Sequence, residues 1–210
     1  MRAGLLEPYE RALRTAGTLG LVDATGRVQP LDVRRWLGPL DSADRSVLAR
    51  CHAPVLDLGC GPGRFVQALA HRGSPVLGVD LAHTAIGLAR RRGGPALHRD
   101  LFAPLPGERR WPTVLLLDGN IGIGGDVSRL LARIARLLAP SGRLLVEIEP
   151  DDRDESLAVR FHDRGAAIDG SFTWARVGLC GLQARAAATG LLVADTWDAG
   201  GRAFAEVRLR

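Results

Sequence analysis

The 210-residue chain contains 46% hydrophobic and 24% charged residues, a balance typical of a globular protein with a sizeable core and not of a disordered one. Its uncharged apolar runs, such as 113–117, are far shorter than the ~20 residues of a membrane-spanning helix. The first residues lack the hydrophobic segment of a secretion signal, so we expect none. The sequence has three widely separated cysteines, Cys51, Cys60 and Cys180. This number and spacing argue against a disulfide framework and indicate a cytoplasmic location.

The formal net charge of +5 comes from arginine, because the 28 basic residues include no lysine. Asn120 is the only asparagine, and tyrosine and methionine each occur once, which is the pattern of a GC-rich genome. We therefore attribute the charge mainly to codon composition, and we expect a small-molecule partner in preference to a nucleic acid. The arginine runs are short and are not interleaved with aromatic residues, so RNA binding is kept only as an alternative.

From residue 54 onward, short β-like runs alternate with helical patterns, which is typical of a parallel sheet with helices on both faces. In chain order we expect strands at 55–58, 75–79, 96–99, 113–118 and 143–148, helices at 63–71, 84–92, 126–140 and 178–188, and two final strands at 191–197 and 202–209. The glycines between the last two strands predict an antiparallel hairpin.

Two segments do not follow this alternation. Residues 1–52 form a proline-interrupted piece in which we expect helices at 8–16 and 42–51. Residues 151–177 contain two runs, 157–163 and 171–176, that predict an inserted hairpin. We therefore divide the chain into an N-terminal helical segment, 1–52, and a main domain, 53–210, that carries the hairpin insertion.

A glycine-rich turn follows the first strand of the main domain. Asp57 is followed by Gly59, Gly61 and Gly63, and such a turn lets the backbone approach a ligand closely at the carboxyl edge of a sheet. The spacing is not the G-x-G-x-x-G of dinucleotide-binding proteins, and no Gly-Lys-Ser/Thr ending marks a phosphate-binding loop. Asp57 would also repel a pyrophosphate, so the turn indicates a ligand with a cationic end.

This segment resembles motif I, D-x-G-x-G-x-G, of the class I S-adenosylmethionine-dependent methyltransferases. The resemblance implies an α/β, Rossmann-like three-layer sandwich with a mostly parallel seven-stranded sheet whose last strand is antiparallel. It also implies that Asp57 and the glycine loop (Gly59, Gly61, Gly63) hold the methionine moiety of S-adenosylmethionine. The alternative is a purely structural strand-to-helix turn.

Acidic residues follow the next two strands. Asp80 ends the second strand, where an acid can accept both ribose hydroxyls of a cofactor. The resemblance assigns Asp80 this role, places Leu81 against the adenine, and lets Asp100, with Leu101 beside it, accept from the adenine amino group. The alternatives are a helix cap for Asp80 and an ordinary loop acid for Asp100.

The fourth strand ends in Asp118-Gly-Asn120, which occupies the position of motif IV beside the transferable methyl group. The resemblance makes both side chains cofactor contacts, and a turn-forming asparagine is the alternative for Asn120. The segment differs from the D/N-P-P-Y/F motif of enzymes that methylate amino groups of nucleic-acid bases or amides. This difference argues against those substrates.

Methyl transfer is an in-line displacement that needs alignment and water exclusion, and a general base is required only when the acceptor must lose a proton. His162, His83 and Asn120 are the candidates for catalytic groups, each more readily explained as structural. Trp174 and Arg176 are candidates for acceptor binding. We find no metal-ligand spacing and expect no metal.

The sequence thus predicts a cytoplasmic S-adenosylmethionine-dependent methyltransferase for a small molecule, for instance a specialised metabolite, that acts as a monomer or homodimer. Residues 1–52 and 151–177 are expected to close over the methyl group and to form most of the acceptor pocket. The alternatives are an RNA methyltransferase and a non-catalytic regulatory protein that binds the cofactor.

Overall fold

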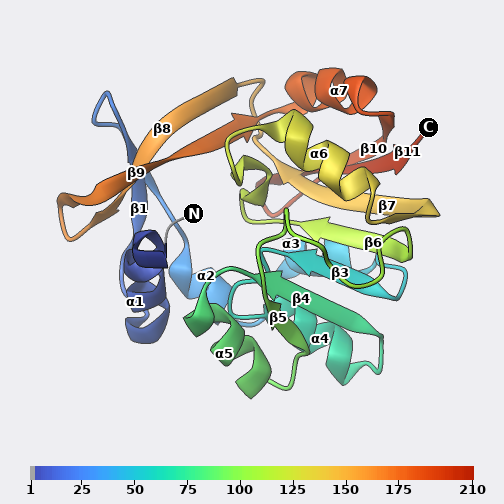
Figure 1. Ribbon diagram of the computed structural model, residues 1–210, viewed down its shortest axis with the longest axis horizontal. Coiled ribbons are helices and arrows are strands. Elements are labelled where there is room, and N and C mark those ends of the chain that lie inside the picture. Colours follow the sequence, from blue (N-terminus) through green and yellow to red (C-terminus); the bar gives the residue numbers. More distant parts are fainter. Residues whose placement is uncertain (1–2) are drawn as a thin grey trace.

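A computed structural model of the protein describes residues 3–210 and contains two sheets (Figure 1). The large sheet has the strand order β10-β11-β7-β6-β3-β4-β5. Its strands are β3 (Val55–Leu58), β4 (Val76–Asp80), β5 (Ala96–His98), β6 (Trp111–Leu116), β7 (Leu138–Ile148), β10 (Leu191–Ala199) and β11 (Arg202–Leu209). The last strand, β11, pairs antiparallel with both β10 and β7, and the other pairs are parallel, so the expected seven-stranded, mostly parallel fold with an antiparallel last strand is confirmed.

Seven α-helices accompany the sheets in the described part of the chain. They are α1 (Glu7–Thr15), α2 (Val33–Leu37), α3 (Ser42–Leu48), α4 (Arg64–His71), α5 (His83–Arg91), α6 (Val127–Ala135) and α7 (Leu179–Ala188). Side-chain caps start several of them: Asp126 accepts from the Arg129 amide, and Asp41 and Asp44 form a capping box at α3. None of these helices, among residues 3–210, combines the length and apolar character needed to cross a membrane.

The large sheet lies in the middle of three layers. Helices α6 and α7 pack through Leu130, Ile134 and Leu182 on one face, and α3 and α4 pack through Val47 and Phe65 on the other. The strands β3 and β6 are buried on both faces because helices cover both, which explains their continuous runs of valine and leucine. The carboxyl ends of β3, β4, β5 and β6 consequently meet at one edge of a rigid sheet.

The small sheet has the order β2-β1-β8-β9 and corrects the expectation that residues 1–52 are wholly helical. Its strands are β1 (Gly20–Asp23), β2 (Val28–Pro30), β8 (Asp154–Asp163) and β9 (Ala166–Val177). Strands β8 and β9 form the hairpin at the predicted insertion, and β1 adds to it antiparallel, with Gly20 opposite His162. A four-residue strand has too few residues to show a periodicity, and its partner lies far along the chain.

A second correction concerns the boundary between α6 and β7. The helix was expected to extend to Pro140, but it ends at Ala135, and Leu138 already belongs to β7. Leu138 pairs with Trp111 of β6, and the Trp111 amide donates to the Leu137 carbonyl at 3.2 Å. The pairing with β6 therefore outweighs the helical spacing of Leu137 and Leu138.

Candidate active site

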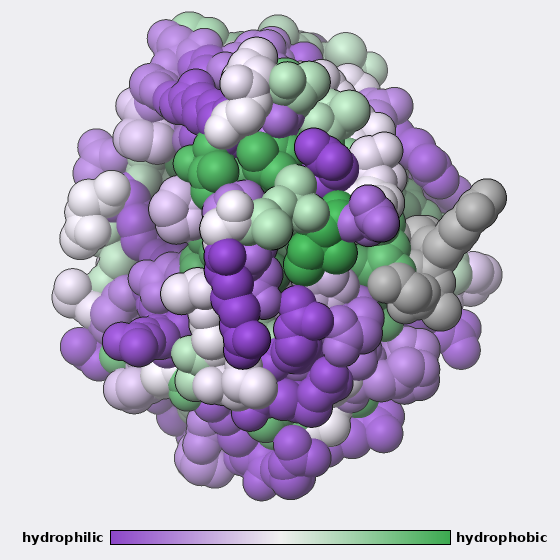
Figure 2. All heavy atoms as spheres, turned by 90° about the vertical axis from the view of Figure 1, so that its left-hand side faces the viewer, coloured by the Kyte–Doolittle hydropathy of each residue, from purple (hydrophilic) through white to green (hydrophobic). Residues whose placement is uncertain are grey.

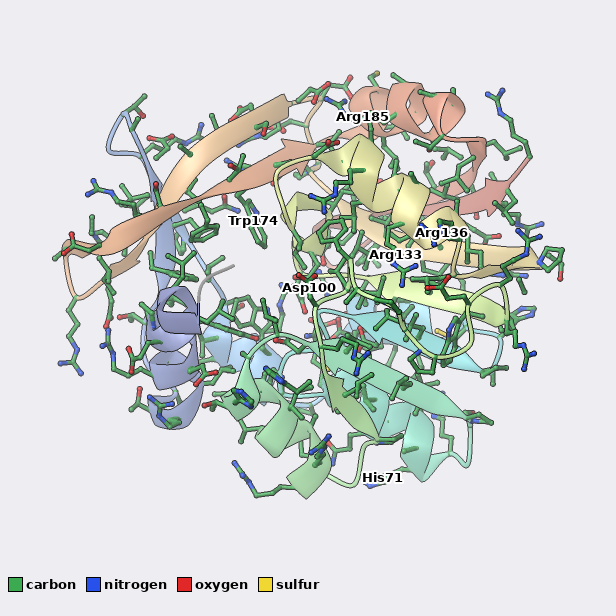
Figure 3. The ribbon with its side chains drawn as sticks, in the orientation of Figure 1. His71, Asp100, Arg133, Arg136, Trp174 and Arg185 are labelled. Atoms are coloured by element: carbon green, nitrogen blue, oxygen red, sulfur yellow. The ribbon has the colours of Figure 1, made fainter. Side chains whose placement is uncertain are left out.

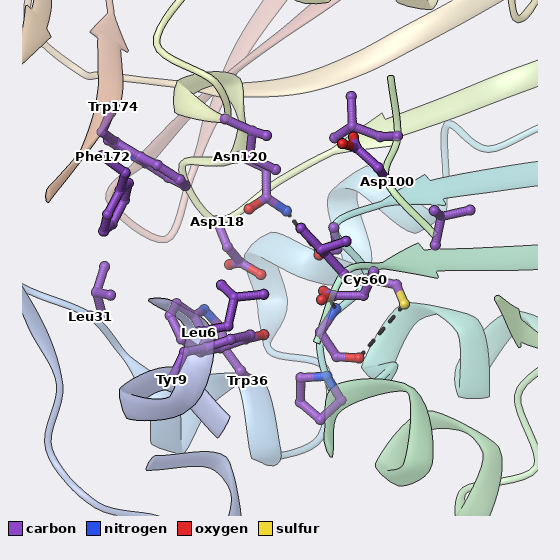
Figure 4. A pocket seen from close by; sticks show the side chains of 18 of the residues that line it. Leu6, Tyr9, Leu31, Trp36, Cys60, Asp100, Asp118, Asn120, Phe172 and Trp174 are labelled. Carbon is purple, nitrogen blue, oxygen red and sulfur yellow. Dashed lines mark hydrogen bonds between the residues drawn. The ribbon is translucent and has the colours of Figure 1, made fainter. Parts of the chain in front are cut away.

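A cavity of about 150 Å³ opens at the carboxyl edge of the large sheet, where the small sheet and α1 face it (Figure 4). One half of its wall comes from the loops that follow β3, β4, β5 and β6. The other half comes from the N-terminal segment and from β8 and β9. The N-terminal segment and the β8–β9 hairpin therefore face the loops at the strand ends across one space.

The glycine loop after β3 forms the floor of the cavity. Gly59, Gly61 and Gly63 have φ values of 71°, 53° and 82°, in the left-handed region that favours glycine. The amides of Gly59 and Cys60 donate to the Val79 carbonyl at 2.8 and 3.0 Å, which fixes the loop to β4. Gly59 and Gly61 line the cavity, whereas Gly63 lies behind it, where a Cβ would come within 2.6 Å of the Ala89 Cβ.

Asp80, at the end of β4, lines the cavity and anchors the glycine loop. Its Oδ2 accepts from the Gly61 amide at 2.9 Å, and its Oδ1 accepts from the Ala82 amide at 2.8 Å. Burial raises the pKa of Asp80, and these backbone hydrogen bonds oppose the shift. Each carboxylate oxygen has further lone-pair capacity toward the cavity, so the predicted ribose contact and the helix-cap alternative are both compatible with the geometry.

Asp57 is buried on β3, behind the residues that line the cavity. Burial raises its pKa to about 7, the Arg64 guanidinium opposes this shift, and Asp118, Asp80 and Asp44 add to it. The structure therefore places Asp57 behind the glycine loop and not in the cavity wall, in contrast to the expectation from the motif.

The other predicted cofactor contacts after β4 and β5 do line the cavity. Leu81, Asp100 and Leu101 are all part of the wall. The loop that carries the last two is held by hydrogen bonds, because Asp100 Oδ1 accepts from the Phe102 amide at 2.9 Å and the Leu101 carbonyl accepts from Arg133 at 2.9 Å. An acidic group and two apolar side chains thus meet at this end of the cavity.

Asp118, after β6, lies in the wall and is surrounded by guanidinium groups. It accepts from Arg35 at 2.9 Å, from Arg64 Nη2 at 3.0 Å and from Arg202 at 3.4 Å. Its own backbone has a φ of 58°, and its amide donates to Glu147. These partners tie the loop after β6 to α2, α4 and β11.

Asn120 connects this loop to the glycine loop. Its Nδ2 donates to the Gly59 carbonyl at 2.9 Å and to the Leu58 carbonyl at 3.2 Å (Figure 4). A Cβ on Gly59 would lie 2.4 Å from the same nitrogen. Asn120 lines the cavity, and its amide group holds two loops at a fixed separation, which makes it a positioning residue in this geometry.

The outer wall contains aromatic residues that sequence analysis did not single out. They are Tyr9, Trp36, Phe161 and Phe172, which join the predicted Trp174. Tyr9 and Trp36 are in edge-to-face contact at 5.9 Å, and the Tyr9 hydroxyl lies 3.2 Å from the position of a Cβ on Gly61. Burial, with Asp80 next, raises the pKa of Tyr9 well above its usual value. The only signal available in the sequence was that Tyr9 is the single tyrosine.

Three weaker candidates lie outside the cavity wall, and the structure gives the reason for each. His83 is exposed at the start of α5 and stacks on His98 at 3.6 Å. His162 is adjacent to Phe161 in β8, and it is the Phe161 ring that lines the cavity. Arg176 is paired with Glu149 at 2.9 Å, away from the main cavity.

Comparison with known proteins was made for both sequence and structure. Residues 55–142 match the family model described as a methyltransferase domain. A trans-aconitate 2-methyltransferase from Paracidovorax citrulli is 36% identical over 107 residues, 48% of this chain and 40% of that protein. A dTDP-3-amino-3,6-dideoxy-alpha-D-glucopyranose N,N-dimethyltransferase from Streptomyces fradiae is 31% identical over 51% of this chain and 45% of that protein. The chain thus spans less than half the length of these two relatives.

Solved structures agree over a larger part of the chain. An S-adenosylmethionine-dependent methyltransferase from Bacteroides fragilis, in complex with S-adenosyl-L-homocysteine, superposes with a TM-score of 0.82 at 20% identity and covers 100% of this chain and 97% of that one. The CcbJ methyltransferase from Streptomyces caelestis gives a TM-score of 0.62 at 19% identity, over 83% of this chain and 92% of that one. Residues 55–142 thus match a methyltransferase domain, and the chain as a whole has the Rossmann-like fold of these solved S-adenosylmethionine-dependent methyltransferases.

Proposed function

We propose that this protein transfers a methyl group from S-adenosylmethionine to a small-molecule acceptor. The observation that carries the proposal is the cavity itself, in which the glycine loop, Asp80 and Asp100 meet opposite an apolar wall. The matched methyltransferase domain and the relatives named above support the same reaction.

The residues present fit the cofactor. Gly61 leaves space between the loop and Tyr9 that a side chain would fill, since a Cβ on Gly61 would lie 3.2 Å from the Tyr9 hydroxyl. We assign Asp80 to the ribose hydroxyls and Asp100 to the adenine amino group, with Leu81 and Leu101 packing on the adenine. We assign Asp57 and Asp118 to the methionine end, Asp118 in the cavity wall and Asp57 buried behind it.

The cofactor supplies an electrophilic methyl group, whose bond to sulfur breaks as a bond to the acceptor forms. The chain's own residues orient the two reactants and exclude water. No histidine is part of the described cavity wall, and the guanidinium partners of Asp118 occupy that carboxylate. We therefore assign no imidazole base to this reaction.

We propose that residues 1–52 and 151–177 act as the lid of this site. Tyr9 and Trp36 of the first segment, and Phe161, Phe172 and Trp174 of the second, line the cavity. Their apolar side chains provide the water exclusion that the displacement needs. We propose a cytoplasmic location as well, which the free thiols of Cys51, Cys60 and Cys180 support. The choice between monomer and homodimer stays a prediction.

The proposal is tested by calorimetric titration of the full chain with S-adenosylhomocysteine. We expect one site per chain with micromolar affinity. A flat titration on folded protein would contradict the cofactor assignment. Incubation with methyl-labelled S-adenosylmethionine and, in parallel, total RNA or a small-molecule extract separates the alternatives. Label in RNA would support the RNA methyltransferase, and cofactor binding without any transfer would support the regulatory protein.

A further inference from the structure

The charged and apolar residues of the cavity wall come from different parts of the chain. All of the charged residues that line the cavity lie at or after the strand ends of the large sheet, and they are Arg64, Asp80, Arg99, Asp100 and Asp118. The described lining residues from the N-terminal segment, β8 and β9 are five aromatic residues and three leucines. The half that faces the acceptor therefore contributes no ionised side chain.

Neither of the two arginines in the wall belongs to its outer half. Arg64 is buried and is bound to Asp44 at 2.9 Å and to Asp118 at 3.0 Å, so its charge is already compensated. Arg99 is exposed and donates to the Pro104 carbonyl at 3.1 Å. Three acids line the same cavity, so a carboxylate in the outer half would be desolvated without a cationic side chain as partner.

The aromatic residues of the outer wall are arranged as two pairs. Phe172 and Trp174 of β9 are edge to face at 6.1 Å, and Phe161 joins them at 5.0 Å from Phe172. Tyr9 and Trp36 form the other pair. Figure 4 shows both pairs on the side of the cavity away from Cys60 and Asp100, and Figure 3 shows Trp174 extending from β9 into the space between the two sheets.

The outer surface around these elements has the same character. Figure 2 shows the face of the molecule that carries the small sheet and α1, with hydrophobic residues in a band across its middle and hydrophilic residues above and below. Aromatic side chains of this kind favour a planar ring as their ligand, because such a ring buries apolar area and can stack edge to face or offset against them.

We propose that the acceptor is an uncharged, flat, mainly apolar ring compound, held between the Phe172–Trp174 pair and the Tyr9–Trp36 pair. This inference rests on the proposed function and narrows its substrate class. It also separates this chain from its trans-aconitate relatives, because trans-aconitate is a tricarboxylate and the outer wall offers it no free cation.

The test compares two probes on the full chain saturated with S-adenosylhomocysteine. Calorimetric titration with 2-naphthol, a neutral planar ring, is expected to give a dissociation constant at least tenfold below that of trans-aconitate. Trp174→Ala is expected to weaken 2-naphthol binding at least tenfold, and Trp174→Phe to restore most of it. Trp197→Ala is the matched control, because Trp197 stacks on Phe204 and Arg50, outside the cavity wall, and its loss leaves 2-naphthol binding unchanged.

A second variant, which introduces a charge, keeps the inference testable if the Trp174→Ala protein does not fold. Phe172→Arg places a cation in the outer wall and is expected to weaken 2-naphthol binding and strengthen trans-aconitate binding, each at least tenfold. The inference is overturned if the natural chain binds trans-aconitate more tightly than 2-naphthol. It is also overturned if neither variant changes 2-naphthol binding. In both cases the cofactor titration still upholds the proposed function. Failure of S-adenosylhomocysteine to bind overturns the proposed function. In that case 2-naphthol is titrated without the cofactor product, and its binding or failure to bind tests the aromatic site independently of the proposed function.

Discussion

Arg64 and Asp44 form a buried ion pair in which both carboxylate oxygens accept from the guanidinium, at 2.9 and 3.0 Å. Asp44 is completely buried at the start of α3, and Arg64 is the first residue of α4, directly after the glycine loop. Burial alone would raise the pKa of Asp44, but hydrogen bonds from Arg64 and Arg202 outweigh it and lower the pKa to about 2. The pair joins the N-terminal segment to the loop assigned to the cofactor.

Removal of this carboxylate should strongly destabilise the fold. Asp44→Ala leaves Arg64 buried with one acidic partner fewer, and breaking a buried pair in this way costs about 3–5 kcal/mol. The free energy of unfolding, measured with guanidinium chloride, checks the value. Asp195→Ala is the control, since its pair with Arg50 is exposed and contributes less than about 1 kcal/mol. Equal effects of the two variants would contradict the role given to Asp44.

Asp57 should make the protein less stable as the pH rises. Burial first of all raises its pKa in the folded chain to about 7, from the ordinary aspartate value of 3.8 that applies to the unfolded chain. Between pH 4 and pH 7 the folded state therefore binds more protons than the unfolded state, and stability falls as the pH increases through this window. Asp57→Asn removes the ionisation and should gain stability relative to the natural protein, with the full difference above pH 7. Unfolding curves from pH 4 to pH 8 measure it, and a difference that does not change with pH would show that Asp57 ionises normally.

Asp80 should combine a structural and a binding role. Asp80→Ala removes the acceptor for the Gly61 and Ala82 amides and, by our assignment, for two ribose hydroxyls. We expect S-adenosylhomocysteine affinity to fall at least tenfold, because each charge-assisted hydrogen bond contributes roughly 1.5–3 kcal/mol. Calorimetry measures the affinity, and Asp126→Ala, which removes only the cap of α6, serves as the control. Unchanged affinity would place the ribose contact elsewhere.

Gly63 should tolerate a side chain far less well than another left-handed glycine. At Gly63 an added Cβ would lie 2.6 Å from the Ala89 Cβ and 2.9 Å from its Cα, whereas nothing lies within 4 Å of a Cβ on Gly73. Gly73→Ala therefore costs only the backbone strain of about 1 kcal/mol, and Gly63→Ala costs that amount plus overpacking of about 1–3 kcal/mol. Thermal unfolding of the two variants compares the costs. Equal melting temperatures of the two variants would show that α4 and α5 can move apart to accommodate the added methyl group without cost.

Deletion of residues 1–16 should separate binding from transfer. It removes α1 with Tyr9 but leaves β1, so the small sheet keeps its central strand. We expect the truncated protein to bind S-adenosylhomocysteine, more weakly than the full chain, and to transfer no methyl group, because the site is open to water. Full activity would show that α1 serves packing alone, and the acceptor site would then lie on β9 and the loop after β6.

The large sheet and the cofactor half of the site were accessible from the sequence because their signals are local. Asp57, the glycines and Arg64 lie within eight consecutive residues, and a strand, turn and helix in that order place the loop at the carboxyl edge of any parallel sheet. The same reasoning placed Asp80, Asp100 and Asp118 at neighbouring strand ends. The continuous apolar runs of β3 and β6 similarly determined that both faces of the sheet are covered.

The sequence assigned residues 1–52 and 151–177 to the outer half of the site, but only the tertiary structure decided which of their side chains line it. The strand β1 exists because Leu21 and Val22 pair with β8, and a four-residue run cannot reveal a partner so distant in the chain. That pairing brings Tyr9 and Trp36 toward Phe172 and Trp174, although none of these residues forms a motif with the others. Local patterns determine which residues occupy a strand end. Contacts between distant segments determine which side chains lie opposite those residues, because the free energy of such contacts depends on burial in the complete fold.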